Sequence, residues 1–144
     1  MTEFGFKTAI ADPEGFVVSH RVYKGNPIDD QTLEHAVAAA QDLGMKVRSV
    51  FADRGFGDVI GDQALVTRGI ADKVIPRKGR ADPVERTRNW RRRYRWRAGC
   101  EGRISCLKRD YGLRRTRLKG LQGAGIWVGF GVLAHNVDRF VALS

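Results

Sequence analysis

The order of strand-like and helix-like segments constrains the fold of this chain more than any other feature. Residues 4–11 and 16–23 alternate apolar and polar side chains, and the Asp12-Pro13-Glu14-Gly15 turn between them predicts a hairpin. The remaining periodicity predicts helices at 29–43, 58–68, 83–111 and 123–143, and strands at 46–52 and 73–75. Strands joined through helices are typical of a covered α/β sheet, so we expect an α/β fold.

In two of these helices the positions of the apolar residues predict how the helix packs. In the 29–43 helix, Leu33, Val37 and Ala40 share one side, which predicts the buried face. The 123–143 segment reads as an apolar helix, with His135 expected to be a core histidine. Its uncharged stretch is too short and too rich in glycine for a membrane span. We expect a core helix, with large side chains at Ile126, Trp127, Phe130, Leu133, Val137 and Phe140, and small residues for close packing at Gly125, Gly129 and Ala134.

The positive charge of the chain is concentrated in one segment. Residues 77–119 hold 17 Lys and Arg against 4 Asp and Glu, a net charge of +13, whereas the remainder of the chain carries −3. A dense basic segment indicates a polyanionic partner, and nucleic acid is the leading candidate because Arg and Lys contacts to phosphate dominate its binding. The alternatives are a solvated cationic face without a partner and a small basic RNA- or ribosome-associated protein.

Asp53 is the first candidate for chemistry, in the sequence Ala52-Asp53-Arg54-Gly55-Phe56. It follows a predicted buried strand directly, and ligands of α/β folds bind at the carboxyl ends of strands. Gly55 is expected to let the chain turn sharply just beyond the carboxylate. The alternative is that Asp53 only caps the next helix.

A second candidate site lies on the predicted 83–111 helix, where Tyr94, Arg97, Glu101 and Lys108 follow the spacing Tyr-x2-Arg-x3-Glu-x6-Lys. At 3.6 residues per turn these positions fall within roughly 60° of one another and form one stripe. A carboxylate among cations suits metal-dependent phosphoryl transfer. In such a site Glu101 would bind a divalent ion, and Arg97 and Lys108 would bind phosphates. The alternative is an ordinary Arg97–Glu101 pair four residues apart.

This spacing resembles the signature of a large superfamily of insertion-sequence DDE transposases, which also places Asp-x-Gly-(Tyr/Phe) at its second catalytic Asp. Asp53-Arg54-Gly55-Phe56 is the match here. The similarity to the group called ISNCY spans essentially the whole chain. Its further motifs are Glu3-Phe4-Gly5-Phe6-Lys7, Gly25-Asn26-Pro27, Pro76-Arg77-Lys78-Gly79, Arg103-Ile104-Ser105-Cys106-Leu107-Lys108-Arg109, Tyr111-Gly112-Leu113 and Gly131-Val132-Leu133-Ala134-His135-Asn136.

The resemblance implies an RNase H-like fold, similar to that of retroviral integrases, in which two Asp and one Glu bind two Mg²⁺ or Mn²⁺ ions. Asp53 would be the second Asp and Glu101 the catalytic Glu. Water or a DNA 3′-hydroxyl would attack a phosphodiester, cleaving strands and joining them. Contacts to transposon-end DNA are implied for Tyr94, Arg97 and Lys108, with phosphate contacts proposed for Arg103, Arg91, Arg92 and Arg93.

The same resemblance places the first catalytic Asp on a central strand ahead of the hairpin, and that strand has no match in this sequence. We therefore expect residues 1–144 to be a partial DDE catalytic domain, N-terminally truncated and inactive alone, with Asp12 in a turn and no substitute for the missing Asp. Its partners would be terminal inverted repeats and target DNA in the bacterial cytoplasm, at the nucleoid, with a homodimer implied by the need to join two ends. The alternative is a catalytically dead remnant that only binds DNA.

Overall fold

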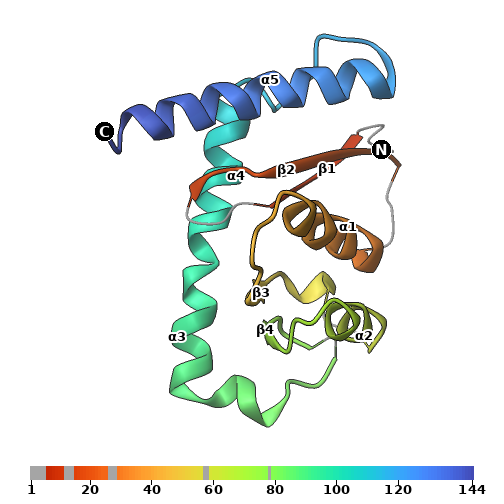
Figure 1. Ribbon diagram of the computed structural model, residues 1–144, viewed down its shortest axis with the longest axis vertical. Coiled ribbons are helices and arrows are strands. Elements are labelled where there is room, and N and C mark those ends of the chain that lie inside the picture. The colour runs from red at the N-terminus through yellow and green to blue at the C-terminus, as the bar shows by residue number, and fades with distance from the viewer. Residues whose placement is uncertain (1–5, 12–14, 26–28, 57–58, 78) are drawn as a thin grey trace. The chain divides into compact units, whose positions relative to one another are not determined.

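The structure is a computed structural model that describes residues 6–11, 15–25, 29–56, 59–77 and 79–144. It divides into two compact units (Figure 1). Met1–Pro27 and Cys100–Ser144 form one, here called the hairpin unit, and Ile28–Gly99 form the other, the parallel-strand unit. The expected turn at Asp12-Pro13-Glu14 and most of the Glu3–Lys7 motif lie outside the described residues.

The hairpin unit begins with the predicted antiparallel pair, β1 (Phe6–Ala11) and β2 (Ser19–Lys24). Its register sets Phe6 opposite Lys24 and Ala11 opposite Ser19. The second strand starts three residues later than predicted. The physical reason lies at Val17, because its backbone N–H donates to Asn136 Oδ1 at 2.9 Å and its C=O accepts from Asn136 Nδ2 at 2.8 Å. A side-chain amide therefore takes the place of a neighbouring strand there.

Two helices complete the hairpin unit: α4 (Ala98–Asp110), which begins just before the unit boundary, and α5 (Gly120–Val141). Gly112, with φ of +73°, ends α4, and the N–H of Leu113 reaches back to the C=O of Leu107 at 3.1 Å. Trp127 of α5 donates from Nε1 to the Gly112 carbonyl at 2.8 Å. The unit's core consists of Val17, Leu107, Val128 and Val132, with Ile10, Val22, Tyr111 and Leu113 packed against it.

A phenol–carboxylate hydrogen bond also joins the two helices of this unit. Tyr111, just beyond the end of α4, donates its hydroxyl to Asp138 Oδ2 on α5 at 2.8 Å. This bond to an ionised carboxylate, with burial a smaller cause, raises the pKa of Tyr111 to about 12. The Tyr111 ring also meets His135 edge-on at 5.4 Å. His135 is 7% exposed, which confirms that it is a core histidine.

The predicted packing of α5 is wrong about which face is buried. The buried residues are Ala124, Val128, Gly131, Val132 and His135. Trp127 is half-buried, and the other large residues expected in the core are exposed: Ile126, Phe130, Leu133, Val137 and Phe140. The helix is apolar all round, so its periodicity could not select a face.

Gly131 explains which face of α5 packs inward. A Cβ at this position would lie 2.0 Å from Leu113 Cδ1 and 2.9 Å from the Tyr111 carbonyl oxygen, so a side chain there would clash. Two of the small residues expected to allow close packing do not lie at a close contact. A Cβ on Gly125 would meet nothing within 4 Å, and Ala134 is exposed. The close approach therefore occurs at Gly131, which the sequence reasoning did not select.

The parallel-strand unit contains α1 (Asp29–Asp42), β3 (Ser49–Phe51), α2 (Val59–Thr67) and β4 (Asp72–Val74). Both helices end near the predicted residues, with Gly44 and Gly69 in the left-handed conformation just beyond them. The burial predicted for the first helix is confirmed, since Leu33, Val37 and Ala40 are all buried. The core of the unit is made of Leu33, Val37, Val50, Leu65, Ile70 and Ile75.

The strands of this unit pair in parallel, with Ser49 opposite Asp72 and Phe51 opposite Val74. Within the part of the chain that the structure describes, this pair and the hairpin form two separate two-stranded sheets. In the same described part, no helix is both long and apolar enough to cross a membrane.

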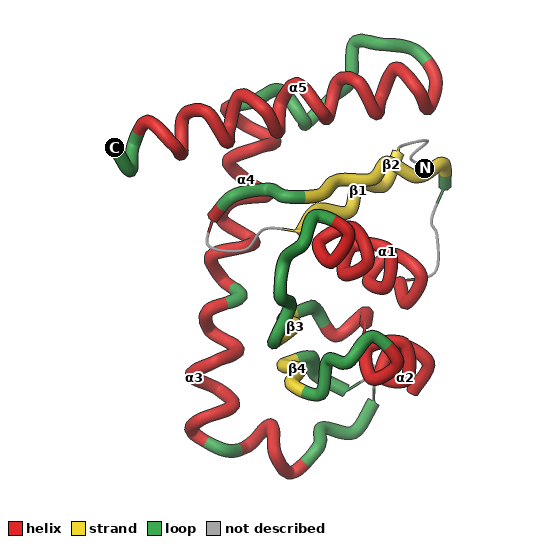
Figure 2. Tube along the Cα trace, in the orientation of Figure 1, coloured by secondary structure: helices red, strands yellow, loops and turns green. Residues whose placement is uncertain are grey.

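The single helix predicted over residues 83–111 is wrong, because the segment is divided into three pieces (Figure 2). A short 3₁₀ turn, η3 (Pro83–Arg86), comes first, and α3 (Arg88–Trp96) and α4 follow. Thr87 is extended, with ψ of 146°, and its hydroxyl caps the new helix by accepting from the N–H of Trp90. The second interruption falls at Arg97, whose backbone stays in the α region.

Candidate metal and nucleic-acid site

Asp53 lies two residues beyond the end of β3, at the carboxyl edge of the parallel pair. Because Phe51 is paired with Val74, the loops that follow β3 and β4 leave this edge side by side. One loop carries Asp53 and the other carries the basic sequence that begins at Arg77. The strand ends at Phe51, one residue earlier than predicted, so the predicted place of Asp53 at the carboxyl end of a strand is confirmed. This is the edge where α/β folds bind ligands.

Local hydrogen bonds orient the Asp53 carboxylate. The backbone N–H of Arg54 donates to Asp53 Oδ1 at 2.7 Å, and that of Phe56 donates to the Asp53 carbonyl at 3.0 Å. The turn that results is a 3₁₀ helix, η2 (Arg54–Phe56), whose backbone any residue can adopt, so the special conformation expected of Gly55 is not what makes the turn. The Asp53 side chain is 64% exposed and open to solvent and ions.

Tyr94 and Arg97, the first two residues of the signature, lie in the same unit as Asp53. The Arg97 guanidinium Nη1 is 3.8 Å from Asp53 Oδ1, and its carbon lies 4.8 Å from the centre of the Tyr94 ring. Tyr94 in turn stacks on Trp90, with ring centres 5.0 Å apart and planes 15° from parallel. A row of planar groups along α3 thus leads to the Asp53 carboxylate.

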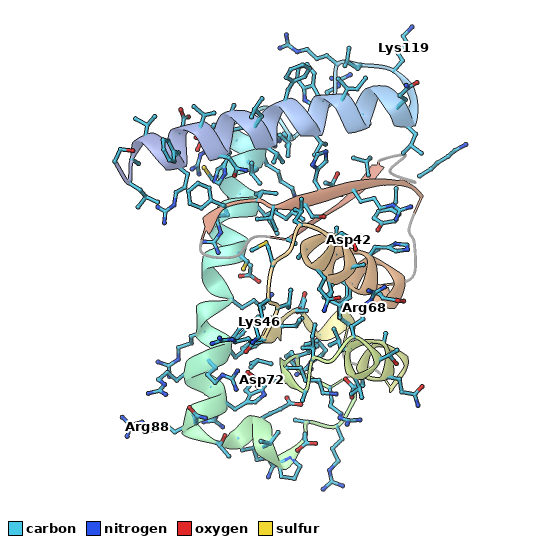
Figure 3. The ribbon with its side chains drawn as sticks, viewed as in Figure 1. Asp42, Lys46, Arg68, Asp72, Arg88 and Lys119 are labelled. Atoms are coloured by element: carbon cyan, nitrogen blue, oxygen red, sulfur yellow. The ribbon has the colours of Figure 1, made fainter. Side chains whose placement is uncertain are left out.

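Arg93 ties α3 to the strands of the parallel-strand unit. Its guanidinium bonds the carboxylate of Asp72, which Figure 3 labels, at the start of β4. The same carboxylate accepts from the Ser49 hydroxyl, and the Arg93 guanidinium lies over the Phe51 ring at 5.6 Å. The bonds from Arg93 and then Ser49 hold the pKa of Asp72 below its usual value, and the same carboxylate raises the pKa of Arg93.

Sequence reasoning missed Asp72. Its role depends on the pairing of Ser49 with Asp72, which brings the hydroxyl and the carboxylate together and has no local sequence signal.

The basic loop after β4 is also held in place by acidic groups. Arg77 lies 3.5 Å from Asp62 and 3.9 Å from Asp82, and Lys73 pairs with the same Asp62 carboxylate. The backbone N–H of Arg77 donates to Glu85 Oε1 at 2.9 Å. Cationic side chains are therefore fixed near the edge of the sheet from which Asp53 also projects.

Glu101 and Lys108, the other half of the signature, lie in the hairpin unit on α4. They are seven residues apart, about two helical turns, and both are exposed on the same side of the helix, while Leu107 faces the core. Arg103 is half-buried, with its guanidinium 3.6 Å from the Cys100 sulfur. Asp53 belongs to the other unit, so its meeting with Glu101 stays a prediction.

Carboxylate oxygens are the ligands that Mg²⁺ and Mn²⁺ prefer, and both Asp53 and Glu101 are exposed enough to accept a hydrated cation. Among the residues that the structure describes, no three His, Cys, Asp or Glu side chains are grouped closely enough to hold a metal ion. The chemistry of the two carboxylates fits a divalent cation, and a complete set of ligands is not assembled by these residues.

Comparison with known proteins connects this arrangement to one family. Residues 3–137 match the family described as the transposase DDE domain. No curated protein sequence and no solved structure matches the chain. The family implies an RNase H-like fold and a DNA substrate, and the α/β elements and the basic 77–119 segment agree with both. The chain belongs to the transposase DDE domain family.

Proposed function

We propose that this chain contributes the second and third acidic residues of an insertion-sequence transposase of the ISNCY-like group. The reaction would be metal-dependent cleavage of DNA strands at the ends of the element and their transfer to target DNA. The observation that carries the proposal is the place of Asp53. It is an exposed carboxylate at the carboxyl edge of two parallel strands, facing an arginine of the signature, in a chain that matches the DDE family over most of its length.

Asp53 and Glu101 would hold Mg²⁺ or Mn²⁺ through their carboxylate oxygens. A bound pair of such ions supplies an activated attacking oxygen and a stabilised leaving oxygen for phosphoryl transfer. The protein's own contribution is positioning. The Arg54 N–H fixes one oxygen of Asp53, and the Arg93–Asp72 pair holds α3 against the strands so that Arg97 reaches the same carboxylate.

The basic residues around these carboxylates would bind DNA. Tyr94 offers a ring for stacking and Arg97 a guanidinium for phosphate, and an incoming phosphate would compete with Asp53 for that guanidinium. Arg93 is the weakest of the proposed phosphate contacts, because it already pairs with Asp72. The proposed DNA-contacting residues are Tyr94, Arg97, Lys108, Arg103, Arg91, Arg92 and Arg93.

We also propose that Asp53 and Glu101 do not suffice for cleavage. The family pattern requires a first Asp that we assign to no residue of this sequence, and Asp12 lies outside the described residues. Two copies would act together in the bacterial cytoplasm, at the nucleoid, because two DNA ends must be joined. The second candidate is a remnant that binds DNA without acting on it, which the basic 77–119 segment favours on its own.

The test is incubation of the purified chain with supercoiled plasmid and Mn²⁺, together with a salt titration of its DNA binding. We expect no nicking, and DNA affinity that falls steeply as salt rises. If Mn²⁺ tightens DNA binding by the parent chain but not by Glu101→Gln, the chain has a metal-dependent site and is not only a DNA-binding remnant. Nicking that disappears in Glu101→Gln would show that the two carboxylates do suffice. DNA binding that is insensitive to salt would contradict the proposed phosphate contacts.

A further inference from the structure

The outer face of α5 carries a row of large apolar side chains that stay largely exposed in the described part of the structure. Ile126, Phe130, Leu133, Val137 and Phe140 are each between 48% and 68% exposed, and we call this row the α5 stripe. At 3.6 residues per turn they fall within roughly 80° of one another. The buried residues Val128 and His135 lie on the opposite side of the helix, where α5 meets its own unit.

The spacing along the α5 stripe is that of a coiled-coil seam. Its members follow one another at intervals of four, three, four and three residues. Such a 3.5-residue repeat is matched by another helix with the same repeat, whose side chains fit as knobs into the holes between these residues. We therefore take a helix with the same repeat as the partner of the stripe.

We propose that the partner is α5 of a second copy of this chain, packed antiparallel about a two-fold axis at Leu133. In that arrangement Leu133 faces its own counterpart, Phe130 faces Val137, and Ile126 faces Phe140. Each aromatic ring then meets a smaller β-branched side chain, so the stripe is complementary to itself in size. An isologous contact of this kind closes after two copies.

Charge and area both agree with this occupant. The helix has no Asp, Glu, Lys or Arg from Gly120 to Val137, in a chain of net charge +10, so this face is not built for DNA phosphate. Covering roughly 100 Å² on each of the five side chains removes about 1,000 Å² from water across two copies, which is about the minimum for a specific interface. Val141, 66% exposed beside the stripe, would add to this area.

The inference does not depend on the catalytic roles proposed above, because the α5 stripe contains none of those residues. It is tested by analytical ultracentrifugation of the full chain over a range of concentrations. We expect a monomer–dimer equilibrium whose dissociation constant rises at least about 30-fold in Phe130→Asp, because a charge would be buried at the interface. Leu121→Asp is the matched control, since it adds the same charge to the same helix away from the stripe.

Cysteine cross-linking tests the pairing itself and does not depend on a disruptive variant. In a background of Cys100→Ser and Cys106→Ser, Leu133→Cys should form a disulfide-linked dimer on mild oxidation. A mixture of Ile126→Cys and Phe140→Cys chains should give the mixed dimer far more readily than either chain alone. A monomer at every concentration, equal effects of Phe130→Asp and Leu121→Asp, or preferential linkage of Ile126→Cys to itself would each overturn the antiparallel α5 dimer.

Discussion

Replacing Arg97 by alanine should tighten the binding of Mn²⁺ at Asp53, although Arg97 belongs to the signature that the site is built around. The Arg97 guanidinium lies 3.8 Å from the Asp53 carboxylate that we propose as a metal ligand. A cation that binds this carboxylate has to displace the guanidinium or share the oxygen with it. Arg97 therefore competes with the metal until DNA phosphate draws it away.

The size of the effect follows from that distance and from the exposure of the pair. Two unit charges 3.8 Å apart interact by about 1 kcal/mol in a water-like dielectric, and exposed ion pairs are measured at roughly 0.2–1 kcal/mol. Asp53 is 64% exposed, so the lower range applies. We expect Arg97→Ala to raise Mn²⁺ affinity by about 1.4- to 5-fold, with a smaller gain at high salt because salt screens exposed charges.

The assay is an Mn²⁺ titration at low salt, with free Mn²⁺ followed by electron paramagnetic resonance. The matched control is Arg95→Ala, which removes the same charge from an exposed position on the same helix. DNA affinity should fall in Arg97→Ala, so the two ligands respond in opposite directions. If Arg97→Ala binds Mn²⁺ no more tightly than Arg95→Ala does, Arg97 does not compete with the metal.

Three further predictions concern the contacts that support the site and the α5 helix. Arg93 lowers the pKa of Asp72, so the ionised carboxylate adds stability above about pH 4 that is lost as pH falls further. In urea unfolding, Asp72→Asn should lower the free energy of unfolding by at most about 1 kcal/mol at neutral pH, and the difference should disappear in acid. A difference that does not change with pH would contradict this role. Because the pKa of Tyr111 is about 12, the contribution of its hydrogen bond to folding stability is present below about pH 10 and is lost as pH rises toward 12. Asp138→Asn should return the pKa of Tyr111, measured by tyrosinate absorbance, toward 10. An unchanged pKa would count against the bond. Asn136→Ala should cost about 1–3 kcal/mol in thermal or urea unfolding, because it leaves a buried backbone N–H and C=O without their partner, and unchanged stability would rule out that role.

The parts of the fold that were predictable from sequence are those fixed by local pattern. Leu33, Val37 and Ala40 were placed on the buried side of α1 because that helix has polar residues on its other side. In α5 the apolar residues surround the helix, and the choice of face depends on the contact of Gly131 with Leu113, which is distant in the sequence. Periodicity carries no information about such a contact.

In the candidate site, too, the local features were predictable from sequence and the contacts between distant residues were not. Asp53 was assigned correctly to the end of a strand because a buried run precedes it and a turn follows. The partner of Arg97 was not predicted, because its approach to Asp53 depends on how α3 is held by the Arg93–Asp72 bond and on the register of two parallel strands. The break at Thr87 was missed although threonine is a common helix cap, because the basic residues on both sides looked continuous.

The most direct test of the proposed function is the affinity of the chain for Mn²⁺ in Asp53→Asn and Glu101→Gln. Both variants remove a carboxylate charge while keeping the shape of the side chain, and Asp110→Asn is the control, an exposed carboxylate near the end of α4 that pairs with Arg109. We expect Asp53→Asn and Glu101→Gln each to weaken Mn²⁺ binding and Asp110→Asn to leave it unchanged, with bulk DNA affinity nearly the same in all three. Equal Mn²⁺ binding in all three variants would contradict the assignment of Asp53 and Glu101 as metal ligands.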